Sequence, residues 1–404
     1  MGLMPVAEAL SRVLAEAEPL GPDSVPLGQA HGRVLTADIE ALRTQPPADV
    51  SAMDGYAVRA DDVATVPAHV KLVGEVAAGH PFEGAVGAGE AARIFTGGLL
   101  PCGSDTIVIQ ENTAREGDTV VVLTSAARGR HVRSQGLDFK RGAVLLPKGR
   151  RLSDRDLALA AAMNHPRLSV HRRPKVAVLA TGDELVMPGS VPGLGKIVHS
   201  NAYATIAMAR REGCGVIDLG IVPDRMEETV LAIRQAREQG ADILVTSGGA
   251  SVGEHDLMPS ALAKEGLALS FWKVAMRPGR PMLHGRLGAM HVLGLPGNPV
   301  SAYVCSILFL VPLIRRLAGR SDIEPVLEPA LLGCNLPEND ERADYLRAHL
   351  APPGPMGLPI ATPTPVQDSS MLAPLAAADC LLVREPHAPP AAAGTPCRVL
   401  RLPV

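Results

Sequence analysis

Short apolar runs and amphipathic stretches alternate along residues 175–323, and this pattern predicts an α/β domain. Four runs have the length and composition of buried strands: Lys175–Ala180, Gly215–Val222, Ala241–Thr246 and Ala289–Leu295. The segments between them carry apolar residues at helical spacing. Strands and helices that alternate in this way form a doubly wound, mostly parallel sheet, whose ligands bind beyond the C-terminal ends of the strands.

Polar residues at the segment boundaries predict where two helices begin. Ser200 or Asn201 can cap a helix that closes at Gly213. Asp224 and Glu227 form an N-cap pair for the next helix. As a cap, Asp224 would have a complete structural role, which leaves open whether it also has a functional one.

The longest apolar run, Val300–Ile314, predicts a buried helix. Asn298 as N-cap and Pro299 at the first helical position mark its start, and Pro312 should kink or shorten it. The run is shorter than the roughly 20 residues that a membrane span needs. We therefore expect a core helix and no membrane segment.

The regions outside the α/β domain have different patterns. Apolar residues recur with helical spacing in Val6–Leu14, which predicts an N-terminal helix. Short apolar runs split by Gly, Pro and Asp make Val25–Leu146 a β-rich region. Ser153–Asp156 resembles a capping box before a short helix. After Glu324 short strands with many Pro and Gly return and predict a small β module.

Composition narrows the class of protein. A chain of 404 residues is too long for one core and suggests two to four domains. The net charge of −3 and the aromatic content of 2% disfavour nucleic-acid binding. The six cysteines are scattered without a C-x-x-C, which favours core thiols in a reducing compartment. No signal peptide is evident at the N-terminus, so we expect a soluble, cytoplasmic protein.

Candidate chemistry lies where strands run into polar, glycine-bearing turns. Three turns follow the predicted strands, at Thr181–Leu185, Ser247–Asp256 and Pro296–Pro299, and a fourth lies upstream at Ser51–Ala57. Glycines let backbone N–H groups approach phosphate oxygens, and helix N-termini add partial positive charge. Each turn carries a carboxylate or lies near one, and a phosphate site mixed with carboxylates usually needs Mg²⁺. This combination points to an enzyme that handles a phosphorylated ligand.

Each acidic position also has a simpler interpretation. The turn after Ser247 can be an ordinary βα loop, although Glu254 and Asp256 just behind it favour phosphate and metal binding. One of Asp183 and Glu184 is expected to be a solvated loop acid. For Asp54, a turn stabilised by an Asx hydrogen bond is the simpler interpretation.

A basic cluster of Lys273, Arg277 and Arg280 can be a surface charge run or a site for a dianion. Alternation within Ser270–Met276 predicts a strand with Trp272, Val274 and Met276 on one face, followed by a turn near Arg277. No Ser-His-Asp or Cys-His arrangement is apparent, so covalent catalysis is not supported.

Taken together, the motifs resemble those of the molybdopterin molybdenumtransferases (MoeA), a family that includes the E domain of gephyrin. The matching stretches follow the family's order: SAMDGYAV (Ser51–Val58), RIFTGG (Arg93–Gly98), TGDEL (Thr181–Leu185), SGGASVGEHD (Ser247–Asp256), RPGRP (Arg277–Pro281) and LPGNPVS (Leu295–Ser301). TGDEL or SGG alone would be weak, but the ordered set is highly specific. The sequence departs from the family at Arg277–Arg280, where K-P-G-K is usual, and at Ala250, where Val is commoner.

The resemblance implies a multidomain α/β plus β fold. Its parts would be a discontinuous N-terminal linking domain (1–46 and 147–174), an inserted β-rich domain (47–146), a doubly wound, MoaB/Mog-like α/β molybdopterin-binding domain (175–323) and a C-terminal β-barrel (324–404). The resemblance further implies a homodimer with shared active sites.

The implied activity is molybdenum insertion. The enzyme would take adenylylated molybdopterin and molybdate, with Mg²⁺, and yield the molybdenum cofactor and AMP. The molybdopterin adenylyltransferase and apo-molybdoenzymes would be further partners. Two alternatives are an adenylyltransferase-like enzyme and a gephyrin-like scaffold. SAMDGYAV lies outside the α/β domain and argues against the first; the complete acidic set argues against the second.

The resemblance also assigns residues. The implied catalytic set is Asp54, Glu184, Asp224, Asp256, Lys273 and Arg277, with Glu184 and Asp256 as metal ligands. The implied substrate-binding set is Thr96, Arg133, Asp138, Thr181, Gly182, Ser247, Gly248, Gly249, Ser251, Gly253, Pro296, Gly297, Asn298, Pro299, Arg347 and Ser369, with Ser370 as the alternative to Ser369.

Overall fold

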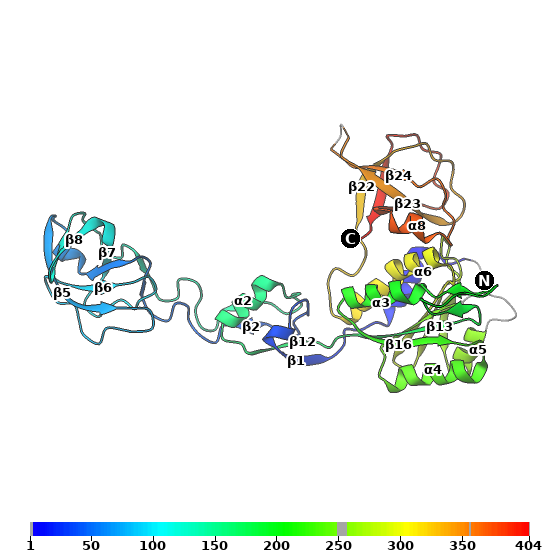
Figure 1. The fold of residues 1–404 in the computed structure, drawn as a ribbon, viewed down its shortest axis with the longest axis horizontal. Helices are drawn as coiled ribbons and strands as arrows, with labels where there is room; N and C mark the ends of the chain where they lie inside the picture. The colour runs from blue at the N-terminus through cyan, green and yellow to red at the C-terminus, as the bar shows by residue number, and fades with distance from the viewer. Residues whose placement is uncertain (1–2, 249–256, 355–356, 404) are drawn as a thin grey trace. The chain divides into compact units, whose positions relative to one another are not determined.

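The computed structural model describes residues 3–248, 257–354 and 357–403. Figure 1 follows the chain from its N-terminus in blue to its C-terminus in red. The chain divides into two compact units. Unit 1 contains residues 1–23, 32–34 and 170–404, and unit 2 contains residues 24–31 and 35–169. The predicted division into four domains remains a prediction.

Unit 2 is β-rich, as the sequence predicted. Its main sheet has the order β7-β4-β6-β5-β9-β8 (Figure 1). Alternate side chains such as Val58, Val70 and Ile107 are buried in it. The strands are β4 (Gly55–Val58), β5 (Ala68–Val76), β6 (Glu90–Ile94), β7 (Thr106–Ile109), β8 (Thr113–Glu116) and β9 (Thr119–Val122).

The rest of unit 2 contains short strands and one helix. Helix α2 (Asp154–Ala162) begins with the predicted capping box: Ser153 accepts from the Asp156 backbone N–H, and Asp156 accepts from that of Ser153. The short strands are β2 (Ile39–Glu40), β3 (Val50–Ser51), β10 (Val132–Arg133) and β11 (Val144–Leu146). Strands β1 (Pro22–Pro26) and β12 (Arg167–His171) each continue from one unit into the other.

The central sheet of unit 1 is doubly wound, as predicted. Its order is β16-β13-β17-β21-β20-β18, with β20 and β18 antiparallel to their neighbours. Helices α3 and α6 cover one face of the sheet, and α4 and α5 cover the other (Figure 1). The strands are β13 (Lys175–Thr181), β16 (Gly215–Val222), β17 (Ile243–Ser247), β18 (Ala268–Trp272), β20 (Leu283–Leu287) and β21 (Met290–Leu295); the helices are α3 (Asn201–Arg211), α4 (Met226–Glu238), α5 (Leu257–Lys264) and α6 (Pro299–Cys305).

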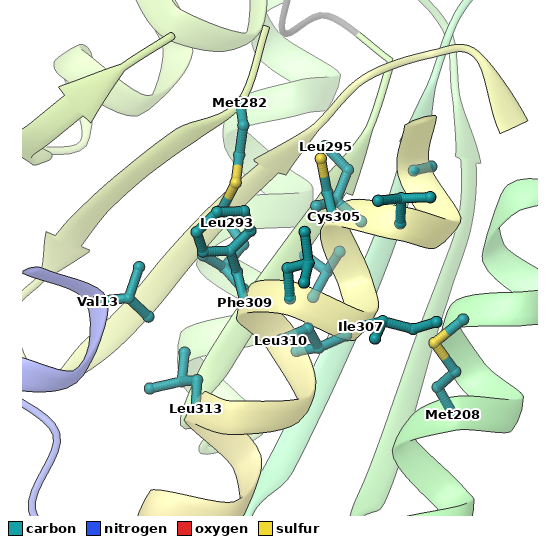
Figure 2. Packing of buried hydrophobic residues seen from close by; sticks show 14 of the residues in the cluster. Val13, Met208, Met282, Leu293, Leu295, Cys305, Ile307, Phe309, Leu310 and Leu313 are labelled. Carbon is teal, nitrogen blue, oxygen red and sulfur yellow. The ribbon is translucent and has the colours of Figure 1, made fainter. Parts of the chain in front are cut away.

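The larger core of unit 1 is built around the helix that begins at Pro299. Phe309 and Leu313 lie toward Val13 of helix α1 (Val6–Ala15), and Cys305 lies near Leu295 of the sheet (Figure 2). A continuous helix from Pro299 to Leu317 has the length and apolarity of a membrane span, but 83% of its most apolar 18-residue window is buried in the structure. It is therefore a core helix.

Pro312 perturbs this helix without ending it. A π-turn, Ser306–Leu310, separates α6 from α7 (Val311–Leu317). The N–H of Val311 bonds to the carbonyl of Ser306, five residues back. Proline has no N–H to donate to the carbonyl four residues before it, so a wider turn at this point is the expected response.

The C-terminal module is a closed five-stranded β-barrel, as predicted. The strands pair in the order β23-β24-β22-β26-β25, and β25 pairs back with β23. Strand β19 (Met276–Arg277) adds to β23 in parallel. The barrel strands are β22 (Leu327–Leu332), β23 (Ala343–Ala351), β24 (Ile360–Pro363), β25 (Cys380–Arg384) and β26 (Pro396–Arg401), and helix α8 (Leu372–Ala376) precedes β25.

Two local predictions were wrong. Asp224 is not an N-cap, because α4 begins only at Met226 and Arg225 occupies the cap position. The predicted strand through Met276 ends at Trp272, because Lys273 has a φ of 86°, in the left-handed region. Beyond that turn, Val274 packs in the same core as Phe271, opposite to Trp272.

Two buried histidines in the sheet predict loss of stability in mild acid. Burial and the nearby Arg286 lower the pKa of His284 to about 4 and that of His291 to about 3. Both stay neutral in the folded state, whereas the unfolded chain protonates them below about pH 6.5. The unfolded state therefore binds more protons between about pH 6.5 and 4, and each histidine should contribute a stability loss approaching about 1.4 kcal/mol per pH unit there.

The matching measurement is urea unfolding of unit 1 from pH 7 to 4.5, followed by the fluorescence of Trp272, the chain's one tryptophan. The His284→Gln/His291→Gln variant should show a shallower pH dependence than the wild type. The exposed His80 provides a control substitution. An equal slope in the wild type and the double variant would contradict the prediction.

Candidate active site

A cavity of about 640 Å³ in unit 1 lies at the C-terminal ends of strands β13, β17 and β21. This is the edge where a doubly wound sheet binds its ligands. All three predicted turns of the α/β domain contribute to it. Its described lining residues are Thr181, Glu184, Leu185, Ile197, Val198, His199, Ser200, Asn201, Ser247, Gly248, Pro281, Pro296, Gly297, Asn298, Pro299, Ser301, Ser370 and Leu372.

Two glycines shape the turns on the β13 and β17 side. Gly248 has a φ of 90°, and a Cβ there would lie 2.5 Å from the carbonyl oxygen of Thr181. Gly182 has a φ of 148°, and a Cβ there would lie 2.5 Å from a carboxylate oxygen of Glu184. Only glycine meets both requirements. The two turns can therefore pack closely, with the Glu184 carboxylate against the Gly182 backbone.

The neighbouring acids bind the backbone of each other's turn. The Asp183 N–H donates to Asp224 Oδ2 at 3.3 Å, and the Asp224 N–H donates to Asp183 Oδ1 at 3.2 Å. This exchange joins the ends of β13 and β16. Neither acid is among the described residues that line the cavity, whereas Glu184 is.

The opposite wall combines the Pro296–Pro299 turn with a loop of the barrel. Asn298 occupies the predicted N-cap position, but its side-chain amide donates to Ser369 Oγ at 2.9 Å. The Val300 N–H donates to the Ser369 carbonyl at 3.0 Å. The next residue, Ser370, lines the cavity. Ser369 and its predicted alternative Ser370 thus lie at this wall.

Arg347 supports the same loop from inside the barrel. Its side chain is almost fully buried, and burial lowers its pKa. Its guanidinium donates to the carbonyls of Met371 at 3.0 Å and Val366 at 3.2 Å, and to Gln367 Oε1 at 3.3 Å. In this structure Arg347 contacts the loop that carries Ser369 and Ser370.

Asn201 is one of the cavity residues that the sequence pattern did not identify as functional. It is the first residue of α3, and the sequence predicted that either Ser200 or Asn201 would cap this helix. Its side chain instead donates to Ser247 Oγ at 3.0 Å and to the Gly297 carbonyl at 2.7 Å. It therefore joins the β17 turn to the β21 turn. These partners lie 46 and 96 residues away in sequence, so no local pattern could reveal them.

The predicted cations are not among the described cavity residues. Arg277 forms ion pairs with Asp344 and with Asp340, the latter at 3.4 Å, and both partners belong to the barrel module. The Lys273 backbone bonds to Met282 and Met4, and the structure gives no described ion-pair partner for its side chain.

In unit 2, Asp54 and Thr96 are in direct contact. The backbone N–H and the hydroxyl of Thr96 donate to Asp54 Oδ1 at 2.7 and 2.8 Å. These two hydrogen bonds hold the pKa of Asp54 below its ordinary value. The turn interpretation of Asp54 is thus compatible with an ionised, exposed carboxylate.

The other two unit 2 candidates, Arg133 and Asp138, are both exposed. Arg133 lies on β10, which pairs with β3 just before the Asp54 turn. The Asp138 N–H donates to the Gln45 carbonyl at 3.0 Å.

Part of the predicted glycine-rich turn lies outside the residues that the structure describes. The candidates Gly249, Ser251, Gly253 and Asp256 lie outside the described residues, as do Glu254 and His255. Within the described part of the chain, no group of three or more His, Cys, Asp or Glu side chains could hold a metal ion. A Mg²⁺ ion commonly keeps several waters and takes only one or two protein carboxylates, so Glu184 fits as one ligand of such a site.

Models of known protein families match three stretches that cover most of the chain. The MoeA N-terminal region (domain I and II) matches residues 4–164. A probable molybdopterin binding domain matches residues 177–316, which include the cavity turns. The MoeA C-terminal region (domain IV) matches residues 329–402.

Individual proteins resemble the chain over 80–99% of its length. A molybdopterin molybdenumtransferase of Nostoc sp. is 38% identical over 330 residues, 80% of this chain and 76% of the relative. That of Synechococcus elongatus is 35% identical over 99% of this chain and all of the relative. A crystal structure of the molybdopterin biosynthesis MoeA protein from Pyrococcus horikosii has a TM-score of 0.84 at 30% identity, covering 99% of both chains.

Proposed function

The chain belongs to the molybdopterin molybdenumtransferases, which insert molybdenum in molybdenum cofactor biosynthesis, and we propose that its substrate is the adenylylated form of molybdopterin. The transfer of molybdenum from molybdate to the dithiolene sulfurs would then accompany hydrolysis of the phosphoric anhydride and release of AMP.

One observation carries this proposal. The cavity brings together glycine-bearing turns at three strand ends, the first turn of helix α3 and one carboxylate. Backbone N–H groups and helix N-termini suit the phosphate oxygens of the ligand. Positioning of the reactants and compensation of their charge are the main requirements of such chemistry, since the dithiolene itself receives the metal. The absence of an apparent nucleophile motif agrees with this requirement.

The proposal assigns roles to the cavity residues. Ser247, Gly248 and Gly297 would bind the phosphate groups, and Thr181 would bind the neighbouring part of the ligand. Glu184, with Asp256 from outside the described residues, would hold Mg²⁺. When bound, that ion would offset the negative charge of the phosphates and of the departing AMP.

Reconstitution tests the proposal. An apo-molybdoenzyme is incubated with the purified chain, molybdate at low concentration, Mg²⁺ and either molybdopterin or its adenylylated form. We expect cofactor formation with stoichiometric AMP release only with the adenylylated form and only with Mg²⁺. Equal activity with both pterins, or full activity in the presence of a chelator, would reject the adenylylated substrate or the metal requirement respectively.

We further propose a cytoplasmic homodimer with shared active sites, as the family resemblance implies. Asp54 of one protomer would then serve a site whose Glu184 belongs to the partner. Heterodimers of Asp54→Ala and Glu184→Ala chains should regain one intact site and about half of the wild-type activity per dimer. No recovery in heterodimers of verified composition, or a fully active monomer in sedimentation, would contradict the proposal.

A further inference from the structure

Asn201 has no role among the residues predicted for this site, yet its contacts tie the cavity together. Its amide nitrogen lies 2.7 Å from the Gly297 carbonyl oxygen. That oxygen can only accept a hydrogen bond, so the nitrogen, and not Oδ1, must face it. The second N–H of the same nitrogen reaches Ser247 Oγ at 3.0 Å. Both amide donors are thus used within the cavity wall.

The hydrogen bond from Asn201 restricts the direction in which the Ser247 hydroxyl can point its proton. A hydroxyl group has one donor and two acceptor positions, and Asn201 occupies an acceptor position. No described residue accepts the Ser247 hydroxyl proton, although the side chain is only 4% exposed and lines the cavity. An acceptor in the cavity would gain the free energy of a hydrogen bond from this buried donor. A ligand oxygen would be such an acceptor.

The start of helix α3 favours the same ligand chemistry. The helix has 11 residues, and neither Ser200 nor Asn201 caps it through its side chain among the described contacts. Its first N–H groups therefore leave partial positive charge at the cavity wall, beside the Ser247 hydroxyl.

We propose that Asn201 is a positioning residue: it holds the Ser247 hydroxyl as a hydrogen-bond donor toward an oxyanion of the bound pterin substrate and fixes the Gly297 turn on the opposite side. The inference rests on the proposed function of the cavity. It predicts that Asn201 affects substrate binding mainly by orienting the Ser247 hydroxyl, and this dependence on Ser247 can be measured.

A double-mutant cycle tests the route. The full chain carries Asn201→Ala, Ser247→Ala or both, and anaerobic binding of adenylylated molybdopterin is followed by pterin fluorescence. Loss of one ordered hydrogen bond to a charged group should weaken binding about tenfold for either single variant. The double variant should be only about tenfold weaker as well, because the second substitution removes a contact that the first has already disabled.

Two further readouts distinguish positioning from a general loss of structure. The KM for the pterin should rise more than kcat falls, since the hydrogen bond acts on binding. Tyr203→Ala, on the exposed side of the same helix, is the matched control and should change neither quantity. Asn201→Leu, which keeps the side chain's shape, replaces Asn201→Ala if the alanine variant does not fold.

The possible outcomes separate the two proposals. The positioning role would be overturned if Asn201→Ala weakened substrate binding by the same factor in the wild-type chain and in the Ser247→Ala chain. Wild-type affinity in the Asn201→Ala chain would overturn it as well. Failure of the wild-type chain to bind adenylylated molybdopterin would instead reject the proposed function, and the inference with it.

Discussion

Replacing Glu184 by alanine is expected to lower the rate of molybdenum insertion by about a hundredfold or more, because removal of one group that stabilises developing charge in an active site typically costs that much. Glu184 is the one carboxylate among the described cavity-lining residues. Its side chain is exposed, and the described contacts include no hydrogen bond or ion pair of its carboxylate, which lies beside the Gly182 backbone. The free energy of unfolding should therefore stay within about 0.5 kcal/mol of the wild type.

The measurement is the initial rate of AMP release and cofactor formation in the reconstituted reaction, with urea unfolding in parallel. Glu227→Ala is the matched control, since Glu227 is an exposed acid in the first turn of α4 and does not line the cavity. Unchanged rates in the Glu184→Ala chain, with normal stability, would remove Glu184 from the catalytic set.

Substitution of Arg277 by alanine should reduce stability, by about 2–3 kcal/mol. The carboxylate of Asp344 is only 6% exposed and pairs with the Arg277 guanidinium. Loss of that guanidinium leaves a buried charge without its main partner, which costs more than the ion pair itself contributes. The Arg277→Ala/Asp344→Ala chain should recover most of the loss in chemical denaturation. An Arg277→Ala chain as stable as the wild type would contradict this account of the pair.

Substitution of Lys273 distinguishes the loss of stability expected for Arg277→Ala from a loss of dianion binding by the Lys273, Arg277 and Arg280 cluster. The structure shows no described ion pair for its side chain, so Lys273→Ala should leave stability nearly unchanged. If Lys273 binds an oxyanion, its loss should weaken binding roughly ten- to hundredfold. Since a ligand would compete with Asp344 for Arg277, we expect Lys273 to be the better probe of anion binding in this cluster.

Local sequence patterns predicted the elements whose cause is local. Pro299 at the first helical position and the Ser153–Asp156 capping box specify helix starts through their nearest neighbours, and both helices begin there. The position of the cavity was also predictable, because parallel strands end at a common edge. Thr181, Ser247 and Pro296 therefore lie around one cavity as expected.

Long-range partners were not predictable in this way. Asp224 satisfies a capping pattern, but its carboxylate binds the Asp183 N–H of a strand end 41 residues earlier. Arg277 sits in a basic run, yet its charge is paired with Asp344, 67 residues later. The turn at Lys273 requires a backbone in the left-handed region, and a lysine in the sequence gives no indication of that conformation. In each case the local sequence was compatible with more than one role or conformation of the residue, and tertiary contacts determined which one occurs.

The contact between Asn298 and Ser369 limits where two related chains can be joined to make a functional chimera. The cavity wall is completed by a loop that belongs, by chain connectivity, to the barrel, and buried Arg347 holds that loop from the barrel interior. A barrel exchanged with that of a relative would carry both the loop and its arginine, but would have to meet Asn298 and Val300 of the recipient. The unit of exchange in a functional chimera is therefore the barrel together with the Pro296–Val300 turn, and a crossover placed between them would divide one binding surface between two parents.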